Sequence, residues 1–250
     1  MDNLVLRENR NGAAVLTLNR PQKLNALNKE MFEALEEHAD ALAREARTIG
    51  LVIIRGAGGN FSAGYDMEEV KELVEARAKP HFHSEVIEKI ANLPQPVISA
   101  VEGHCSTGAL ELALAADLVV STRTAQFSDV YARWGLTPIW GLSLRLPHRI
   151  GTAQAAEMMF SCRTYTGVEA HQMHLVNFCF AEDRFESDLG ALSRDILTNS
   201  WFSNQVNKRV LIATAGLTTR EAHALDLFKN EGVAPDADER VAGFMSKRQR

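Results

Sequence analysis

The sequence predicts an α/β fold: a core of alternating strands and helices, followed by a helical C-terminal part. Two observations carry this prediction. Short β-branched runs, typical of buried strands, alternate with longer stretches whose apolar residues recur at helical spacing. From about residue 150 onward the helical spacing dominates, with alanine, leucine and acidic residues throughout. Strands that alternate with helices indicate a parallel sheet with crossover connections.

The predicted strands are short runs rich in valine, isoleucine and leucine, which suit a buried sheet. The first ends at the turn signal Asn19-Arg20-Pro21, and the second leads into a glycine cluster. The third follows Pro94 and Pro96, which hold the preceding chain extended. The fourth comes after an alanine-rich stretch. In chain order, we expect strands at 14–18, 51–54, 97–101 and 118–121.

The predicted helices carry apolar residues three or four positions apart. The first has Met31, Leu35, Ala39 and Leu42 on one face, and Asn28 is placed to cap its N-terminus. The second is charged and partly exposed, whereas the third is rich in alanine and leucine, which favours a buried helix. In chain order, we expect helices at 28–46, about 68–92, 109–116, 151–160, 166–174 and 183–199.

The chain of 250 residues shows no internal repeat and no low-complexity linker. We therefore place the division by the change in pattern alone, with an α/β core over residues 1–190 and a helical region over 191–250. The contents of 46% apolar and 24% charged residues are ordinary for a globular protein, so disordered and fibrous classes are excluded.

Charge and cysteine usage narrow the partners and the compartment. The formal net charge of -5 argues against nucleic acid or an anionic membrane as the main partner, because both are negatively charged and bind positively charged protein surfaces. No uncharged stretch could span a bilayer, and the N-terminus lacks the apolar segment of a signal peptide. The three scattered cysteines suit a reducing compartment. We expect a cytoplasmic protein.

Residues 53–66 read IIRGAGGNFSAGYD, a strand followed by glycines. A dinucleotide fingerprint has glycine at its first, third and sixth places, and here Gly56 and Gly58 supply two while Phe61 takes the sixth. A phosphate-binding P-loop fails as well, because no Gly-Lys-Ser/Thr follows. We expect Gly56, Gly58 and Gly59 to form a tight turn.

Two strand-to-helix junctions match each other. Phe61-Ser62-Ala63-Gly64 and Ser106-Thr107-Gly108-Ala109 place small residues where a strand turns into a helix, which leaves backbone N–H groups unshielded. Two such groups, converging, would form a hole for an oxygen that gains negative charge, as a thioester carbonyl does on becoming an enolate. Glu111 follows three residues after Gly108 among apolar neighbours, which raise the pKa of an acid and let it exchange protons near neutrality.

Several motifs occur together in one order along the chain. They are Asn19-Arg20-Pro21 with Asn25-Ala26-Leu27, the run Phe61 to Asp66, Ala100 to Gly103, Gly108 with Glu111-Leu112-Ala113, Asp117, and Ala125-Gln126-Phe127. In this combination the chain resembles the crotonase family, the enoyl-CoA hydratase/isomerase group, from residue 14 to the tail. The resemblance implies a superhelix of ββα turns, a C-terminal helical region used for trimer contacts, and acyl-CoA thioester ligands.

The resemblance also implies residue roles. Ala63 and Gly108 would supply the two oxyanion-hole N–H groups, and Glu111 would be one of the two catalytic glutamates of the hydratases. Tyr131 stands where the second glutamate is expected. Implied substrate-binding residues are Lys23, Leu24, Ala26, Gly64, Tyr65 and Asp66, together with Phe244 and Lys247, which would reach a ligand from the tail of the same or a neighbouring subunit.

Tyr131 leaves the reaction open. Hydration of a double bond requires two acidic side chains that hold one water between them. Tyr131 is a poor substitute for the second acid, because a phenol with a reference pKa near 10 is a poor base. Thr107 and Glu102 also stand where many relatives carry glycine and asparagine. Hydration or dehydration of an enoyl-CoA is the first expectation, enoyl isomerisation the second, and a non-catalytic acyl-CoA-binding protein the rival.

We expect no cofactor beyond the CoA of the substrate, and a homotrimer or a dimer of trimers.

Other polar clusters have simpler interpretations. His104, Cys105 and Ser106 are adjacent, but the nucleophile motif Gly-x-Ser-x-Gly is not present. The pairs His81/His83 and His171/His174 lack the further ligands that a metal site needs, so we expect packed or solvated histidines and no metal. Asp66 is expected to cap or charge the start of its helix.

Overall fold

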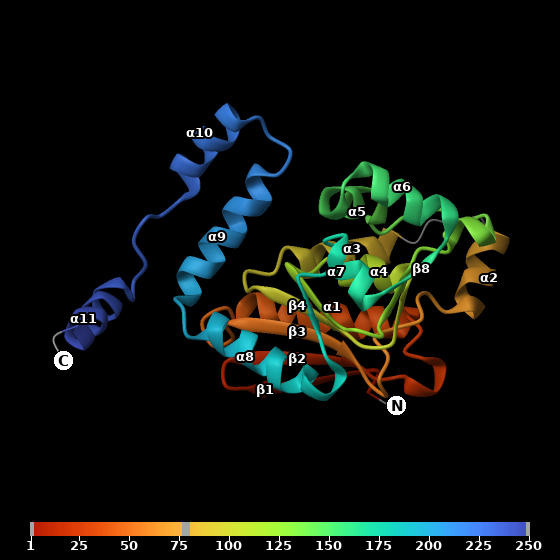
Figure 1. Cartoon of the computed structure of the whole chain (residues 1–250), viewed down its shortest axis with the longest axis horizontal. Helices are drawn as coiled ribbons and strands as arrows, with labels where there is room; N and C mark the ends of the chain where they lie inside the picture. Colours follow the sequence, from red (N-terminus) through yellow and green to blue (C-terminus); the bar gives the residue numbers. More distant parts are fainter. Residues whose placement is uncertain (1–2, 77–80, 249–250) are drawn as a thin grey trace.

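The computed structural model describes residues 3–76 and 81–248 (Figure 1). Its centre is a six-stranded sheet in the order β1-β2-β3-β4-β6-β9, with a second sheet in the order β5-β7-β8. The β1–β2 pair is antiparallel and the other pairs of the large sheet are parallel, which confirms the predicted α/β class. The strands are β1 Val5–Arg10, β2 Ala13–Leu18, β3 Leu51–Gly56, β4 Val97–Val101, β5 His104–Ser106, β6 Leu118–Thr122, β7 Gln126–Ser128, β8 Thr164–Thr166 and β9 Phe178–Phe180.

The helices include every predicted one. The stretch predicted as a single helix at 68–92 forms two, α2 and α3, and residues 77–80 between them lie outside the described part. The helices are α1 Lys29–Arg44, α2 Met67–Ala76, α3 His81–Ala91, α4 Gly108–Ala113, α5 Leu142–Ile150, α6 Thr152–Ser161, α7 Gly167–Gln172, α8 Phe185–Leu197, α9 Trp201–Thr214, α10 Thr219–Lys229 and α11 Ala237–Arg248, with 3-10 turns η1 Pro21–Lys23, η2 Tyr131–Trp134 and η3 Glu182–Arg184. Within the described residues, every helix is too short or too polar to cross a bilayer.

The large sheet separates two apolar cores, as the alternation of side chains along a strand requires. On β3, Val52 and Ile54 join the larger core. Leu51 and Ile53 point the other way, into a smaller core that includes Phe185 of α8. α1 lies on the side of the larger core and buries its predicted face there, and the side chain of its cap Asn28 accepts a hydrogen bond from the Met31 amide at 3.2 Å.

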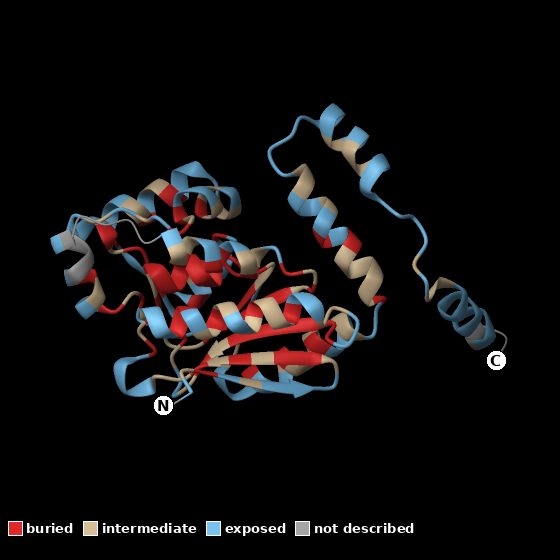
Figure 2. Ribbon diagram, turned by 180° about the vertical axis from the view of Figure 1, so that it is seen from behind, coloured by how far each residue is buried: buried red, intermediate tan, exposed pale blue. Residues whose placement is uncertain are grey.

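The C-terminal helices stand away from the sheet. Figures 1 and 2 show α9, α10 and α11 as an extended arm, in which α10 and α11 are mostly exposed whereas α9 is mostly of intermediate burial. α8 runs unbroken across residue 190 and packs on the sheet, so the change from core to arm comes after Leu197 rather than at the predicted boundary of 190. The arm is anchored by the buried Lys208, whose Nζ lies 2.7 Å from Oδ2 of Asp117 and 3.0 Å from the carbonyl oxygen of Gln95.

Candidate active site

One buried amide joins the loops that follow β2 and β3. The Asn25 side chain donates to the carbonyl oxygens of Ala57 at 2.8 Å and Asn60 at 2.7 Å, and it accepts a hydrogen bond from the Arg20 amide at 2.9 Å. Because Asn25 is fully buried, leaving these carbonyls without a donor would be costly. The two loops therefore hold a fixed position at the carboxyl ends of neighbouring parallel strands.

The glycine cluster after β3 is a tight turn, as predicted. Gly58 and Gly59 have φ angles of +68° and +73°, which glycine adopts without strain. At Gly56 the turn folds back so closely that a Cβ atom would lie 1.8 Å from the carbonyl oxygen of Asn60. The glycine cluster thus forms the tight turn after β3 and directs the chain into the segment from Phe61 to Gly64.

The two predicted junctions meet in space. Gly64 has φ +108°, and a Cβ atom placed on it would lie 2.3 Å from Oγ1 of Thr107 and 2.6 Å from the carbonyl oxygen of Ser106. A parallel bridge between Ser62 and Cys105 aligns the two segments. Only glycine permits this approach, so the sequence Ala-Gly before α2 is what brings the first junction against the start of α4.

The Ala63 amide has a partner within the fold, which corrects its assignment as an oxyanion-hole donor. Its N–H donates to the carbonyl oxygen of Leu24 at 2.9 Å. The next amide, that of Gly64, donates to Oγ of Ser62 at 3.1 Å. Both bonds are local to the loops joined by Asn25, and an N–H that is already paired does not serve a second strong acceptor.

The orientation of the following peptide is set by a bridge to Leu27. The Leu27 amide donates to the carbonyl oxygen of Gly64 at 2.8 Å, and the Asp66 amide donates to the carbonyl oxygen of Leu27 at 2.7 Å. In this parallel pattern the intervening residue turns its N–H to the side opposite its neighbour. The Tyr65 N–H therefore points away from Leu27. The sequence analysis named Tyr65 as a substrate-binding residue but did not single out its N–H, because the alternation depends on the pairing with Leu27.

The second junction carries an unusual backbone at Thr107. This β-branched residue has φ +51° and ψ -114°, a conformation that side chains strongly disfavour. It is held there by its amide, which donates to the carbonyl oxygen of Ser128 at 2.9 Å, and by its hydroxyl, which donates to the carbonyl oxygen of Ser106 at 2.8 Å. The turn at Thr107 starts α4 at Gly108, whose N–H has no acceptor within the helix.

Glu111 lies on α4 with a fully buried side chain, and three donors hold its carboxylate. The Tyr131 hydroxyl donates to Oε2 at 2.7 Å. The main-chain amides of Trp140 and Leu142 donate to Oε1 at 2.8 Å and 3.1 Å. A carboxylate offers about four acceptor positions, so the three bonds leave about one position, on Oε2. The Glu111 carboxylate can therefore accept or donate a single proton at Oε2, whose position is fixed by these hydrogen bonds.

Burial dominates the electrostatics of this pair. It raises the pKa of Glu111, and the hydrogen bonds from Tyr131 and the two amides offset it only in part. Burial and then the neighbouring Glu111 charge raise the pKa of Tyr131 well above its usual value of 10.0. The phenol therefore stays protonated at neutral pH and acts as a donor. Of the two, Glu111 is the candidate for changing its protonation state, because burial raises its pKa toward neutrality while the phenol stays protonated.

Next to Tyr131, Asp129 is also buried. Its Oδ1 accepts a hydrogen bond from the Tyr131 amide at 3.1 Å and so holds the first turn of η2. Burial raises the pKa of Asp129. No local pattern singled out this carboxylate, because its burial depends on how β7 and η2 are placed.

Four aromatic rings pack against one another beside Gly108. The Trp140 ring is stacked on His83 with 5.2 Å between centroids, and it meets Phe32 edge-on at 5.0 Å and Tyr65 at 4.9 Å. We call Phe32, Tyr65, His83 and Trp140 the ring cluster. Its members come from α1, from the segments before α2 and α5, and from α3, so no local sequence pattern predicts it.

The residues predicted to bind CoA lie around η1 and the start of α2. Lys23 and Leu24 are exposed, with Lys23 Nζ 3.3 Å from Oε1 of Glu68, and Ala26 is half-buried. Asp66 is buried: it pairs with Arg20 and accepts a hydrogen bond from the Glu68 amide at 3.0 Å. It thus caps α2, as predicted. Burial opposes the charged form, but these hydrogen bonds outweigh it and lower the pKa of Asp66.

The predicted tail residues belong to α11, which lies far from α4, the helix that carries Glu111 (Figure 1). Phe244 is exposed on α11, at the end of the arm (Figure 1). Lys247 also belongs to α11, but its side chain lies outside the described residues. Either residue can reach an active site only if the arm meets another subunit.

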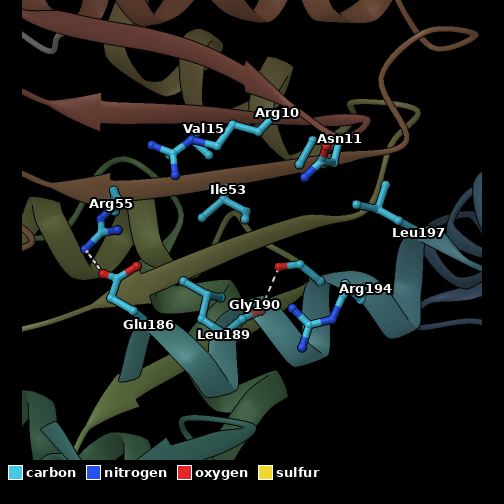
Figure 3. A pocket seen from close by; sticks show the side chains of 12 residues that line it. Arg10, Asn11, Val15, Ile53, Arg55, Glu186, Leu189, Gly190, Arg194 and Leu197 are labelled. Carbon is cyan, nitrogen blue, oxygen red and sulfur yellow. Dashed lines mark hydrogen bonds and ion pairs between the residues drawn. The ribbon is translucent and has the colours of Figure 1, made fainter. Parts of the chain in front are cut away.

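A separate cavity of about 260 Å³ opens between α8 and the strands β1 to β3 (Figure 3). Apolar side chains such as Ile53 and Leu189 line it together with arginines, and Arg55 is paired there with Glu102 at 3.0 Å and Glu186 at 2.6 Å. None of the predicted site residues lines this cavity.

The other polar clusters show no catalytic arrangement. The Cys105 side chain is completely buried, and burial raises the pKa of its thiol far above the usual value, which makes it a poor nucleophile. Among the side chains that the structure describes, no group of three or more histidine, cysteine, aspartate and glutamate residues could hold a metal ion.

The site thus consists of a buried acid that is held by a phenol and two main-chain amides beside the strained start of α4. The Enoyl-CoA hydratase/isomerase family model matches residues 8–250. The chain belongs to the enoyl-CoA hydratase/isomerase family. The predicted membership is confirmed.

Individual relatives agree with the family match. The chain is 30% identical to a "Probable enoyl-CoA hydratase" of Rhizobium meliloti, over 98% of this chain and 96% of that protein. It is 28% identical to the 1,2-epoxyphenylacetyl-CoA isomerase of Escherichia coli, over 99% and 97%. Among solved structures, the enoyl-CoA hydratase of Bacillus anthracis matches with a TM-score of 0.92 and 25% identity, over 98% of this chain and 96% of that one. The predicted crotonase-type fold is thereby confirmed.

Proposed function

We propose that the protein is an enzyme that hydrates the double bond of an enoyl-CoA or removes water from the product. The observation that carries the proposal is the buried 2.7 Å hydrogen bond between the Tyr131 hydroxyl and Glu111, one helical turn from Gly108. The names of the relatives support an acyl-CoA thioester as substrate, because they include hydratases and an isomerase of such thioesters. CoA enters as part of the substrate, and no further cofactor is needed for this chemistry.

The proposed reaction uses main-chain donors for the carbonyl and one carboxylate for the proton. The Gly108 N–H and the Tyr65 N–H are the candidate donors to the thioester oxygen, and each such donor typically contributes a factor of about 100 to 1,000 to the rate. Ionised Glu111 takes a proton from the water that attacks the β-carbon and delivers a proton to the α-carbon. Tyr131 keeps its own proton and fixes Oε2.

Isomerisation is the second candidate, and one observation favours it. Three of about four acceptor positions on Glu111 are filled, and the residue in the place of the second glutamate is a phenol that stays protonated. A single base can move one proton along an acyl chain, from the γ-carbon to the α-carbon, without holding a water. Both reactions use the same enolate and the same donors.

A panel of enoyl-CoA thioesters followed by mass spectrometry tests the proposal. Hydration adds the mass of one water, whereas isomerisation leaves the mass unchanged and moves the double bond. In deuterium oxide, an enzyme of either kind exchanges the α-proton, and Glu111→Gln abolishes this exchange. A non-catalytic acyl-CoA-binding protein would instead bind the thioesters without turnover or exchange, which would contradict the proposal.

The assembly we propose is a homotrimer or a dimer of trimers in the cytoplasm. Support comes from large apolar side chains on the arm that are exposed in the single chain, namely Leu211, Leu227, Phe228, Val233 and Phe244. Such a surface marks a protein interface. Light scattering after size exclusion measures the mass: we expect three or six chains, and Phe228→Asp with Leu211→Asp should lower it. A monomeric wild type would contradict this assembly.

A further inference from the structure

We propose that Trp140 sets the length of the acyl group and restricts the enzyme to short-chain acyl-CoA thioesters. The inference rests on the proposed function, because it assumes that a thioester binds at Gly108 and Glu111. It adds the substrate class, which neither the family nor the relatives specify.

Trp140 contacts both groups between which the reacting carbons must lie. A Cβ atom placed on Gly108 would lie 2.4 Å from Cζ3 of Trp140, so the indole ring packs directly on the main chain of the oxyanion donor. The main-chain amide of the same residue binds Oε1 of Glu111 at 2.8 Å. An acyl chain whose carbonyl lies at Gly108 and whose α-carbon lies at Glu111 therefore leaves the reaction centre beside this indole.

The far side of the indole is closed by the rest of the ring cluster. Trp140 is 1% exposed and Phe32 is completely buried. Phe32 belongs to α1 and His83 to α3, and these two helices pack against each other in the larger core. The ring of Trp140 therefore moves aside only if several packed rings move with it, which is costly in a close-packed interior.

The remaining wall is Tyr131. Its side chain is 8% exposed, and its hydroxyl is fixed to Glu111 by the 2.7 Å hydrogen bond. The carboxylate is thus enclosed by Tyr131 on Oε2 and by the Trp140 loop on Oε1. A short acyl group needs only the space at the carboxylate, whereas a long one needs the space that the indole fills.

Trp140→Ala separates the side chain from the main-chain role of the residue. The substitution keeps the amide that binds Glu111 and removes the indole from Gly108 and the ring cluster. Trp134→Ala is the matched control, because Trp134 is 62% exposed on η2 and lies outside the ring cluster. Trp140→Leu is a second variant that keeps an apolar side chain in place if the alanine variant does not fold.

The test measures binding of saturated acyl-CoA thioesters by calorimetry, so it does not depend on turnover. We compare the dissociation constants of butyryl-CoA and octanoyl-CoA. Each buried methylene is worth roughly fourfold in affinity, so a pocket that admits the longer chain should favour octanoyl-CoA strongly. Wild type and Trp134→Ala should instead bind butyryl-CoA at least about tenfold more tightly than octanoyl-CoA. Trp140→Ala or Trp140→Leu should shift that ratio toward octanoyl-CoA by about tenfold or more.

The outcomes separate this inference from the proposed function. Equal or tighter binding of octanoyl-CoA by the wild type overturns the inference, and so does a ratio unchanged in both Trp140 variants. Chain-length selectivity that depends on Trp140 supports it even if no enoyl-CoA is turned over. Absent turnover and absent α-proton exchange count against the proposed function alone. If neither thioester binds the wild type, the acyl-CoA site and this inference both fail.

Discussion

The hydroxyl of Tyr131 and the carboxylate of Glu111 form one hydrogen-bonded unit, with 2.7 Å between the phenol oxygen and Oε2. The unit combines a group that changes its protonation state with a group that does not. Burial raises the pKa of both side chains, which keeps the phenol a donor and brings the carboxyl group toward the range in which it can exchange protons. The predictions below follow from this unit and from the backbone around it.

Glu111→Gln should lower the turnover of the enoyl-CoA substrate by about 100-fold to 10,000-fold, the range that a positioned general acid-base typically supplies. Steady-state kinetics with the best thioester of the panel measures it. Glu157→Gln is the control, because that glutamate is exposed on α6. Activity that survives in Glu111→Gln would show that another group carries the proton.

Tyr131→Phe should shift the pH dependence of activity upward. The hydrogen bond from Tyr131 lowers the pKa of Glu111, so its removal raises that pKa and moves the pH at which Glu111 ionises to a higher value. We expect the acidic limb of the pH profile to move to higher pH, because the carboxylate loses one hydrogen bond to its charged form. The pH profile of kcat/KM measures the shift.

Tyr165→Phe provides the matched control for that experiment. Tyr165 donates to Oε1 of Glu157 at 3.1 Å, away from the site, so its removal deletes a similar bond without touching Glu111. An unmoved pH profile in Tyr131→Phe would mean that the phenol does not tune the carboxylate.

The stability of the wild type relative to Glu111→Gln should fall as pH rises. The pKa of Glu111 in the folded protein is raised above its reference value of 4.5, so the protonated form is favoured by folding. Its contribution is fully present below about pH 4.5 and is lost as pH rises through the folded pKa. Urea unfolding of both proteins between pH 4 and pH 8 measures the difference. A difference that rises with pH would contradict burial as the dominant influence.

Thr107→Gly should stabilise the protein. The φ of +51° and ψ of -114° place a β-branched residue where only glycine rests without strain, and such strain costs on the order of 1 to 3 kcal/mol. Glycine also increases the conformational entropy of the unfolded chain, which offsets part of the strain that is relieved. We therefore expect a net increase of about 1 kcal/mol in the free energy of unfolding. Thr107→Ala keeps the strained Cβ and loses the hydroxyl, so it should not stabilise; equal values for the two variants would argue against strain.

Lys208→Met should loosen the arm from the core. The Lys208 side chain is 6% exposed, and its ammonium is the partner of Asp117 at 2.7 Å. Removing one member of a buried ion pair typically costs 3 to 5 kcal/mol, and about 2 kcal/mol is expected here because the Asp117 side chain is 31% exposed. Thermal unfolding measures the loss, with Lys229→Met on exposed α10 as control. An unchanged midpoint would show that other contacts hold α9.

The amide at Ala63 shows where prediction from sequence stopped. The small residues Ala63 and Gly64 correctly marked a junction that meets the start of α4, because glycine alone tolerates that approach. Which N–H faces the site depends on the bridge between Leu27 and Tyr65, a pairing between segments almost 40 residues apart in sequence. The prediction therefore located the junction, but the Ala63 amide that it chose is paired with the carbonyl oxygen of Leu24.

The ring cluster shows a second limit. Hydrophobic spacing placed Met31, Leu35, Ala39 and Leu42 on the buried face of α1, but it says nothing about which ring from another helix lies opposite. Trp140 and His83 meet only because α3 and the loop before α5 fold over the same end of the sheet. Side-chain packing across such distances leaves no periodic trace in the sequence.

By itself, the sequence determined the alternation of strands and helices, the family, the buried acid at Glu111 and the tyrosine in place of a second glutamate. These features follow from local spacing and from residue types that a short segment displays. The tertiary structure alone decided which main-chain amides are paired within the loops, how many donors hold the carboxylate and which rings pack beside Gly108. Those properties depend on contacts between distant segments, whose geometry is fixed only when the whole chain packs.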